Sequence, residues 1–346
     1  MLITMSEETC PRGERIHQMF EQPMGWLNTS LPIFMEISVM PDVLSHIQQA
    51  RWHEALGRPP EDVHATVIMP IHDEENTLPS ALGALMLSDI PDSAHIQFLF
   101  IVNGCSDGGR SRQIIEQFLE DLGPIIEEPL PTFERDTAMR PTMKTALRNN
   151  LRFSLIETDM ASKTNALTIG NTIAVTRDDV LAVNTDANNW LEPDALRQLF
   201  SQSYSAILNN EAFVFGGKSM IAYRPSPLAF LFEFAQKQIG ITGKPENKSL
   251  SGWLMAWNPH WLSNIMGGFP PVATDDYTLS LLSRKEGKDV MFAPEAKSWG
   301  YFPNTVVEKI HVYVRIVRDK LQLESHFRDD QKIRQLLLQD NIYLCP

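Results

Sequence analysis

Asp186 and Asn188 are the first residues whose types and spacing could do chemistry. They follow a short apolar run, residues 180–183, which is typical of a buried parallel strand. In open α/β sheets ligands bind beyond the carboxyl ends of the strands, so both side chains are expected where a ligand would lie. Two oxygen donors one residue apart suit a hard divalent cation that also contacts substrate phosphates. An Asx turn that joins the strand to a following helix explains the same two residues equally well.

Three further polar clusters occur where the sequence predicts that strands end or helices begin. Taken singly, His72 is more often a half-buried histidine, Asn103 part of a tight turn, and Lys163 a solvated start of a helix. In a parallel sheet, however, all three clusters would meet in the crevice that contains Asp186. Their common position favours a binding site over three separate structural explanations. The clusters are residues 70–75, 103–108 and 162–166.

From residue 65 onward, short apolar runs alternate with amphipathic helical stretches. Repeated β-α units with short connections predict a parallel sheet with right-handed crossovers, which is the core of an α/β fold. The exception is the stretch 123–150, which is rich in proline, acid and threonine and too long for an ordinary connection, so we expect a lid or a disordered insertion there. The predicted strands are 65–70, 96–102, 151–156 and 180–183, and the predicted helices are 76–87, 110–122 and 163–175.

The second half of the chain mixes strands and helices without this strict alternation. We expect a domain at 63–304, with a first half, 63–193, suited to a nucleotide and a second half, 194–304, suited to a variable partner substrate. Residues 1–62 are expected to form a helical extension, and residues 305–346 to form C-terminal helices. In the second half the predicted helices are 194–208, 228–239, 276–285 and most of 305–338, with strands at 213–223 and 253–257 and a polar loop at 243–251.

Composition and charge limit the classes of function. The 346 residues suffice for one large or two modest domains, and 43% hydrophobic residues are enough for a real core. A formal net charge of -13 argues against non-specific binding of nucleic acid, which depends on cationic side chains. The three cysteines are too few and too scattered for a disulfide framework or a zinc site, which favours a reducing compartment. No apolar run approaches the roughly 18 residues of a membrane span and no signal peptide is evident, so we expect a cytoplasmic protein with at most peripheral membrane contact.

The polar clusters resemble the motifs of the family 2 glycosyltransferases, which have the GT-A fold, over roughly residues 64–320. Each motif is weak by itself, but five of them in the expected order and spacing make a specific match. They are the first-strand signature at 70–75, the uracil-side turn at 103–107, the Lys-x-x-Ala-Leu motif at Lys163, Ala166 and Leu167, the Asp-x-Asp motif at 186–188 with Pro193 at the expected offset, and the Gly-Gly-Phe-Pro turn at 267–270 before the acidic pair Asp275 and Asp276.

The resemblance implies a Rossmann-like, mostly parallel nucleotide-binding sheet with a mixed acceptor half. It also implies an inverting hexosyl- or hexosaminyltransferase that uses a nucleotide-diphosphate sugar, foremost a UDP-sugar, and a sugar, a lipid-linked molecule or another hydroxyl compound as acceptor. Asp276 would be the general base, with Asp275 as the alternate. A divalent cation, Mn²⁺ or Mg²⁺, bound by Asp186 and Asn188 would stabilise the departing diphosphate. The residues implied to bind the nucleotide sugar are Pro70, His72, Glu74, Asn103, Lys163 and Asp186.

Two features depart from the family pattern. Asn188 stands where the second aspartate usually binds the metal; its amide oxygen can still coordinate, but with less charge, so weaker cation binding is expected. The Gln-x-x-Arg-Trp motif of processive synthases is absent, and the corresponding helix contains Arg315 and Arg318 instead. Together with the absence of membrane spans, this argues against a membrane-embedded polymer synthase.

Three alternatives remain open from the sequence. One carboxylate of the acidic pair could simply cap the helix 276–285. A nucleotidyltransferase would share the α/β nucleotide domain, but it normally has a basic, glycine-rich loop after the first strand, where this chain has a histidine followed by three acids at 72–75. A non-catalytic nucleotide-sugar-binding or scaffold protein is the third interpretation, which the neutral side chain of Asn188 leaves open.

Overall fold

The computed structural model describes residues 63–106, 109–130, 142–222, 250, 252–272, 275–301 and 306–339. The expected extension 1–62, the helix 228–239 and nearly all of the loop 243–251 lie outside the described residues. The strands are β1 (His64–Ile71), β2 (His95–Asn103), β3 (Ile125–Pro129), β4 (Thr142–Arg148), β5 (Leu151–Thr158), β6 (Leu181–Thr185), β7 (Asn189–Leu191), β8 (Val214–Ala222), β9 (Leu254–Trp257) and β10 (Met291–Tyr301). The helices are α4 (Leu78–Met86), α5 (Arg110–Leu122), α6 (Lys163–Thr176), α7 (Ala195–Leu208), α9 (Pro259–Met266), α10 (Asp275–Lys285), α11 (Val306–His326) and α12 (Gln331–Gln339).

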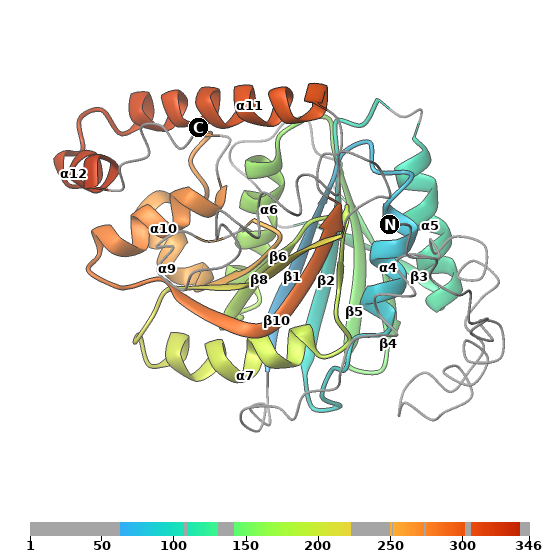
Figure 1. Cartoon of the computed structure of the whole chain (residues 1–346). Helices are drawn as coiled ribbons and strands as arrows, with labels where there is room; N and C mark the ends of the chain where they lie inside the picture. Colours follow the sequence, from blue (N-terminus) through green and yellow to red (C-terminus); the bar gives the residue numbers. More distant parts are fainter. Residues whose placement is uncertain are drawn as a thin grey trace, which may run out of the picture.

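The described strands form one mixed sheet in the order β3-β4-β5-β2-β1-β6-β9-β8-β10-β7, with helices on both faces (Figure 1). Neighbours β5, β2, β1 and β6 are all parallel, as the alternating sequence pattern predicted. Beyond β6 the sheet becomes mixed, because β9 runs antiparallel to both β6 and β8 while β10 runs parallel to β8. The α/β class is therefore confirmed, with four adjacent parallel strands within a mixed sheet.

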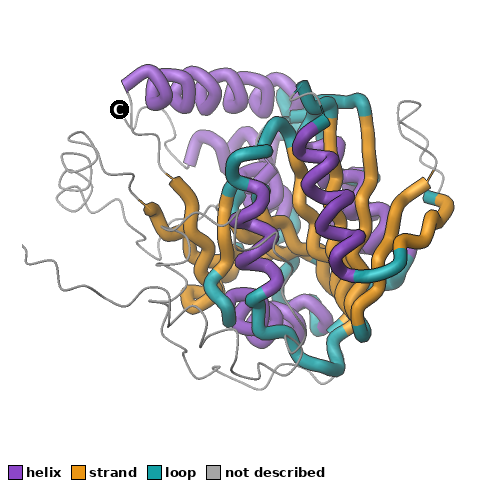
Figure 2. Tube along the Cα trace, turned by 90° about the vertical axis from the view of Figure 1, so that its right-hand side faces the viewer, coloured by secondary structure: helices purple, strands orange, loops and turns teal. Residues whose placement is uncertain are grey.

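The parallel strands are buried on both faces because their side chains alternate between two apolar layers. Val67, Met69 and Ile71 of β1 pack in the core beneath α4, α5 and α7. Ile68, between them, lies in the opposite core together with residues of α6, α9, α10 and α12. Figure 2, a quarter turn from Figure 1, shows these helices on either side of the sheet. This three-layer arrangement holds the carboxyl ends of β1, β2, β5 and β6 at one edge.

The expectation of a lid or disordered insertion at 123–150 is wrong for the part that the structure describes. Strand β3 pairs antiparallel with β4, and β4 pairs antiparallel with β5, so both extend the sheet at its edge. The buried hydroxyl of Thr145 in β4 contacts Glu128 at 3.0 Å and Ser154 at 2.9 Å. Edge strands commonly contain charged residues and proline, which is why this composition resembled a loop. Residues 131–141 lie outside the described residues.

Strands β7, at the end of the first half, and β10, in the second half, were not predicted. Strand β7 has three residues, too few for a periodic signal, and it follows the Asp-x-Asp segment directly. Strand β10 contains charged and exposed positions among its eleven residues, which hides its alternation. The two strands pair antiparallel, with Trp190 opposite Trp299. The chain therefore passes from β6 to the far edge of the sheet before α7 begins.

Candidate active site

The expected site residues come from the carboxyl ends of parallel strands and from the first turns of two helices. Asp186 follows β6 directly, and Lys163 is the first residue of α6. The cap of α6 is Ser162, whose hydroxyl accepts the backbone N–H of Asn165 at 3.2 Å. Asp275 and Asp276 occupy the first turn of α10. The structure thus brings together residues that are far apart in the sequence.

Lys163 connects the Asp-x-Asp segment to the acidic pair. Its Nζ lies 2.7 Å from Asp186 Oδ1 and 3.0 Å from Asp275 Oδ2. Burial by itself would lower the pKa of Lys163, but the two carboxylates raise it above its ordinary value. The interpretation of Lys163 as a solvated helix start is therefore wrong, since this ammonium is a paired, permanently charged group at the centre of the cluster.

Asp276 is fixed by two backbone donors. Its Oδ2 accepts the N–H of Gly252 at 3.0 Å, and its Oδ1 accepts the N–H of Tyr277 at 2.7 Å. Burial, with the negative charge of Asp275 beside it, raises the pKa of Asp276 to about 6, although Lys163 and the two donors act in the opposite direction. Such a carboxylate is ionised at neutral pH and is more basic than an ordinary aspartate, as a general base needs to be.

Gly252 and Asn184 are two members of the site that the sequence did not suggest. The side-chain amide of Asn184 donates to Gly252 O at 2.6 Å and to Asp186 Oδ1 at 3.2 Å. A Cβ added at Gly252 would lie 3.4 Å from Lys163 Nζ and 3.5 Å from Asp276 Oδ2, so a larger side chain would enter the space between them. Asparagine in an otherwise apolar strand was the available signal for Asn184, whereas nothing local distinguished Gly252.

The glycine-rich turn before the acidic pair packs against α6. Gly268 has φ +135°, and a Cβ there would lie 2.6 Å from Thr168 Cγ2. The next residue, Phe269, donates its backbone N–H to the Thr168 hydroxyl at 3.1 Å. Only glycine permits this approach and this backbone conformation. The turn therefore fixes the segment before α10 against α6, the helix that begins with Lys163.

Glu74 and Asn188 lie on the β1 side of the cluster. Asn188 donates its amide to Glu74 Oε1 at 3.3 Å, and Thr77 donates its hydroxyl to Glu74 Oε2 at 2.7 Å. Burial and the charge of Asp186 raise the pKa of Glu74, against the effect of these two hydrogen bonds. Since the amide nitrogen of Asn188 faces Glu74, its oxygen is the atom left for a cation. Pro70 lies further back, within β1 and opposite Ile101 of β2.

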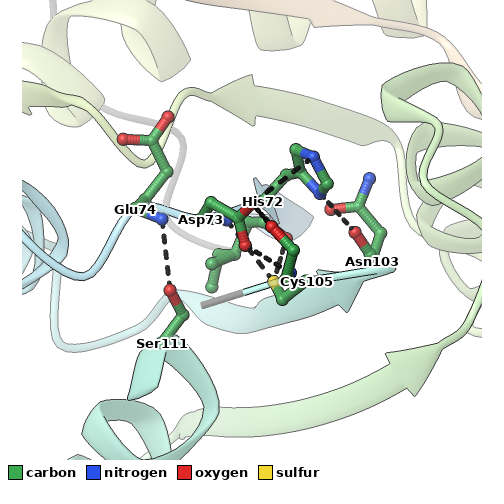
Figure 3. A network of polar contacts seen from close by, with 8 residues as sticks. His72, Asp73, Glu74, Asn103, Cys105 and Ser111 are labelled. Atoms are coloured by element: carbon green, nitrogen blue, oxygen red, sulfur yellow. Dashed lines mark hydrogen bonds and ion pairs between the residues drawn. The ribbon is translucent and has the colours of Figure 1, made fainter. Parts of the chain in front are cut away.

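The β1–β2 loops place His72 beside Asn103 (Figure 3). His72 Nδ1 lies 2.8 Å from the carbonyl oxygen of Asn103, while half of the histidine side chain, 51%, is exposed. The Asn103 side chain is buried, and its Oδ1 accepts no hydrogen bond from the described residues. Both residues are at the expected edge of the sheet, but they are not in the ion-pair network of Lys163.

The donors near Asp186 fit a hard divalent cation. Carboxylate oxygens of Asp186 and Glu74 and the amide oxygen of Asn188 are the ligand types that Mn²⁺ and Mg²⁺ use. Among the described residues, Lys163 is the one cation paired with the carboxylates of Asp186 and Asp275, so further positive charge would be favourable there. Asp186 and Asn188 are the residues that would bind the ion, with Glu74 adjacent.

A separate apolar groove of about 860 Å³ lies beside α11 and contains none of these residues. It is bordered by Pro271 and Val272 from the turn before α10 and by Val314, Val317 and Leu321 of α11. Helix α11 lies across the top of the molecule in Figure 1. Among the described residues, no helix has both the length and the apolar content to cross a membrane.

No family model matches the sequence, and no curated protein matches it either. Among solved structures, the chain is similar to the mannosyltransferase PcManGT from Pyrobaculum calidifontis in complex with GDP-Man and Mn²⁺, with 17% identity, 83% of this chain and 70% of that chain covered, and a TM-score of 0.48. It is also similar to S. aureus TarS 1-349 in complex with UDP, with 12% identity, 69% and 61% covered, and a TM-score of 0.45. The full TarS structure is matched over 37% of its length.

These neighbours are glycosyltransferases of the GT-A type, the class that the sequence motifs resemble. At such identities and TM-scores the likeness concerns the arrangement of helices and strands alone. The chemistry of the site is therefore judged from its own geometry.

Proposed function

We propose that this protein is a cation-dependent, inverting glycosyltransferase that moves a sugar from a nucleotide-diphosphate sugar, foremost a UDP-sugar, to an acceptor hydroxyl. The observation that carries the proposal is the ion-pair network at the carboxyl edge of the sheet. Lys163 lies between Asp186 and Asp275, and Asp276 follows directly. This arrangement combines a cationic group that can bind the diphosphate of the donor with a basic carboxylate that can take a proton from the acceptor hydroxyl. The few, scattered cysteines support the cytoplasm as its setting.

The diphosphate end of the donor is assigned to Lys163 and the Asp186 side. Lys163 remains charged at every physiological pH, so it can attract the phosphates and steady the negative charge that develops on the leaving group. A divalent cation at Asp186 and Asn188 would supply additional positive charge to the diphosphate. The nucleoside is assigned to the carboxyl ends of β1 and β2 and the loop after β1, where Pro70, His72, Glu74 and Asn103 lie.

The acceptor end is assigned to Asp276. A general base must lie within hydrogen-bond reach of the hydroxyl from which it takes a proton. The N–H groups of Gly252 and Tyr277 each occupy one position on the carboxylate, which can accept about four hydrogen bonds in total. They fix its direction and still leave lone pairs for the acceptor. Asp275, which is paired with Lys163, is the alternate base.

The competing functions receive less support. A nucleotidyltransferase needs cationic groups after the first strand, whereas Asp73 and Glu74 occupy that loop, and Arg110 is already paired with Glu75 at 2.9 Å. A non-catalytic binding protein would need Lys163 and Asp186 but would have no use for a carboxylate with a raised pKa. Asp276 is therefore the feature that favours an enzyme.

The proposal is tested by the melting temperature and by calorimetric titration of the protein with UDP- and GDP-sugars, with and without Mn²⁺. Ligand at about 100 times its Kd stabilises the native state by about 2.7 kcal/mol, so a correct donor raises the melting temperature measurably. Asp186→Ala should abolish the cation-dependent part of this binding, and Asn188→Asp should tighten cation binding. Asp329→Ala, at an exposed surface carboxylate, is the matched control and should bind like the wild type.

Turnover then separates an enzyme from a binding module. Slow, cation-dependent hydrolysis of the bound nucleotide sugar without acceptor is the expected result for a transferase. Tight binding without any hydrolysis or transfer would favour the module. Unchanged affinity of Asp186→Ala in the presence of Mn²⁺ would remove the proposed donor site.

A further inference from the structure

A second group of potential metal ligands lies at the ends of β1 and β2, apart from the Lys163 network. It consists of His72, Asp73 and Cys105, whose ligand atoms all lie within 4.8 Å of one another. Figure 3 shows the three side chains converging between the two loops. No motif in the sequence indicated this site, because its cysteine and histidine lack the short spacing of zinc motifs and are brought together by the parallel pairing of β1 with β2.

The orientation of His72 is fixed as in metal-binding histidines. Its Nδ1 lies 2.8 Å from the carbonyl oxygen of Asn103, which can only accept, so Nδ1 carries the proton and donates it. Nε2 therefore has the lone pair, and it lies 3.9 Å from Asp73 Oδ2. Histidine ligands typically donate the other ring N–H to a carbonyl or carboxylate in this way, which sets both tautomer and direction.

Asp73 and Cys105 are also positioned by neighbouring groups. The carboxylate of Asp73 accepts the backbone N–H of Ser106 at 2.6 Å and the hydroxyl of the same residue. The sulfur of Cys105 accepts the backbone N–H of Asp73 at 3.5 Å and donates its S–H to the carbonyl oxygen of Ile71 at 3.6 Å. These contacts fix the position of the sulfur, and the thiol proton would be lost when the sulfur binds a metal as the thiolate.

We propose that His72 Nε2, one Asp73 carboxylate oxygen and Cys105 Sγ bind a borderline divalent cation of the Zn²⁺ type, with a fourth position open. Nitrogen, sulfur and oxygen ligands from three residues suit tetrahedral zinc. They suit Mn²⁺ and Mg²⁺ poorly, because a thiolate is a soft ligand. The protein therefore has two cation sites of different preference, and this one does not depend on the proposed transferase activity.

Binding at this site has a defined proton balance. The cysteine must change from thiol to thiolate in order to bind the ion. One proton is therefore released to the solvent for each ion bound, and the apparent affinity rises with pH while the thiol is protonated.

The test uses the full chain and the metal alone. Co²⁺ should give a thiolate-to-metal charge-transfer band, with the visible bands of a tetrahedral ion, that saturates at one equivalent of thiolate-bound metal. Cys105→Ser should lose the charge-transfer band, whereas Cys345→Ser, the matched control, should keep it. In Zn²⁺ titrations His72→Gln and Asp73→Asn should each lower affinity by about 10-fold or more. Asparagine is the appropriate replacement because Asp73 has φ 54°, which asparagine also tolerates.

A measurement on the wild type covers the case in which Cys105→Ser folds poorly. Zn²⁺ should slow alkylation of Cys105, as located by peptide mass spectrometry, but should leave Cys345 unaffected. A Co²⁺ spectrum without a thiolate band, or equal alkylation of Cys105 with and without Zn²⁺, would overturn the proposal. Failure of nucleotide-sugar binding would not overturn the proposed metal site, because these assays contain no nucleotide.

Discussion

Lys163 and Asp276 show how neighbouring groups decide what a residue does. The ammonium of Lys163 is held between Asp186 and Asp275, while the carboxylate of Asp276 is desolvated by burial, accepts two backbone donors and has the like charge of Asp275 beside it. The first environment stabilises a charge, and the second raises a pKa. Two charged side chains in one crevice thus have opposite electrostatic environments, which supports the proposed roles of a fixed cation and a base.

Replacing Asp276 by asparagine tests the base directly. Asp276→Asn keeps the shape of the side chain and removes its basicity, so we expect donor binding to survive while transfer falls by about 100-fold or more. Donor affinity by titration and transfer rate by product analysis are the two measurements. Asparagine caps a helix nearly as well as aspartate, so persistent activity would mean that Asp276 only caps α10.

The companion variant Asp275→Asn shows which acid of the pair is the base. An inactive Asp275→Asn beside an active Asp276→Asn would move the role back by one residue. Activity in both variants would remove the proposed mechanism.

The raised pKa of Asp276 predicts a pH dependence of the reaction. The base must be ionised, so transfer should decline as the pH falls through about 6. Asp275→Asn removes a nearby negative charge that raises this pKa, so the midpoint of the residual activity should move to lower pH. Profiles of transfer rate against pH for the wild type and Asp275→Asn check this prediction. An identical midpoint would show that the charge of Asp275 does not affect the pKa of the base.

The same group also affects folding, with a definite sign. The pKa of Asp276 in the folded protein is above its ordinary value of 3.8, so protonation favours the folded state. This contribution is fully present below pH 3.8 and is lost as the pH rises through about 6.

At the scale of elements, α6 is the helix that positions the site. Its first residue is Lys163, and its middle lies close against β1 at Gly170, where a Cβ would lie 2.5 Å from Ile68 Cδ1 and 2.6 Å from Cγ1. Ile68 is β-branched and fully buried, so it cannot easily turn away. The absence of a side chain at Gly170 therefore sets how near the helix lies to the sheet.

Gly170→Ala should destabilise the protein although alanine favours helices. The gain in helix propensity is about 1 kcal/mol, whereas forcing a methyl group into a packed core costs about 1–3 kcal/mol and displaces α6. Urea denaturation should show the loss, accompanied by weaker donor binding because Lys163 moves with the helix. Thr176→Ala, at the exposed end of the same helix, is the control and should change the free energy of unfolding by no more than about 0.5 kcal/mol.

At the scale of the whole molecule, the two expected halves share one sheet. β6 is paired on one side by β1 and on the other by β9, and β7 is paired by β10. The nucleotide half therefore contains strands whose partners belong to the acceptor half. The division at residue 193 is proposed as a functional one, and the structure gives no reason to expect two independently folding units.

A fragment of residues 63–193 should accordingly fail to fold alone. It would leave the buried β6 without β9 and expose the apolar edge that β9 covers, which favours aggregation. Circular dichroism and size-exclusion chromatography of the fragment, with residues 63–339 as the matched control, measure this. A monomeric fragment with a cooperative melting transition would show that the first half is a domain by itself.

The sequence by itself determined the order and type of most elements in the first half. Apolar runs, helical spacing and polar residues at strand ends are local signals, and α5 begins and ends where they predicted. They also indicated Asp186, Lys163 and the acidic pair as one site, because parallel strands place their carboxyl ends at one edge. The edge strand β3, its neighbour β4 and the short β7 were not predicted, since pairing with neighbouring strands stabilises them more than their own sequence pattern does.

Only the tertiary structure decided the contacts on which the chemistry depends. The pairing of Lys163 with both carboxylates, the backbone donor of Gly252 to Asp276, and the meeting of His72 with Cys105 each join segments that are distant in sequence. No local pattern contains such information, because pKa values and ligand geometry depend on distances and burial that arise only when the chain folds. Residue types could therefore predict which reaction is feasible, whereas packing produced the paired ammonium of Lys163 and the raised pKa of Asp276.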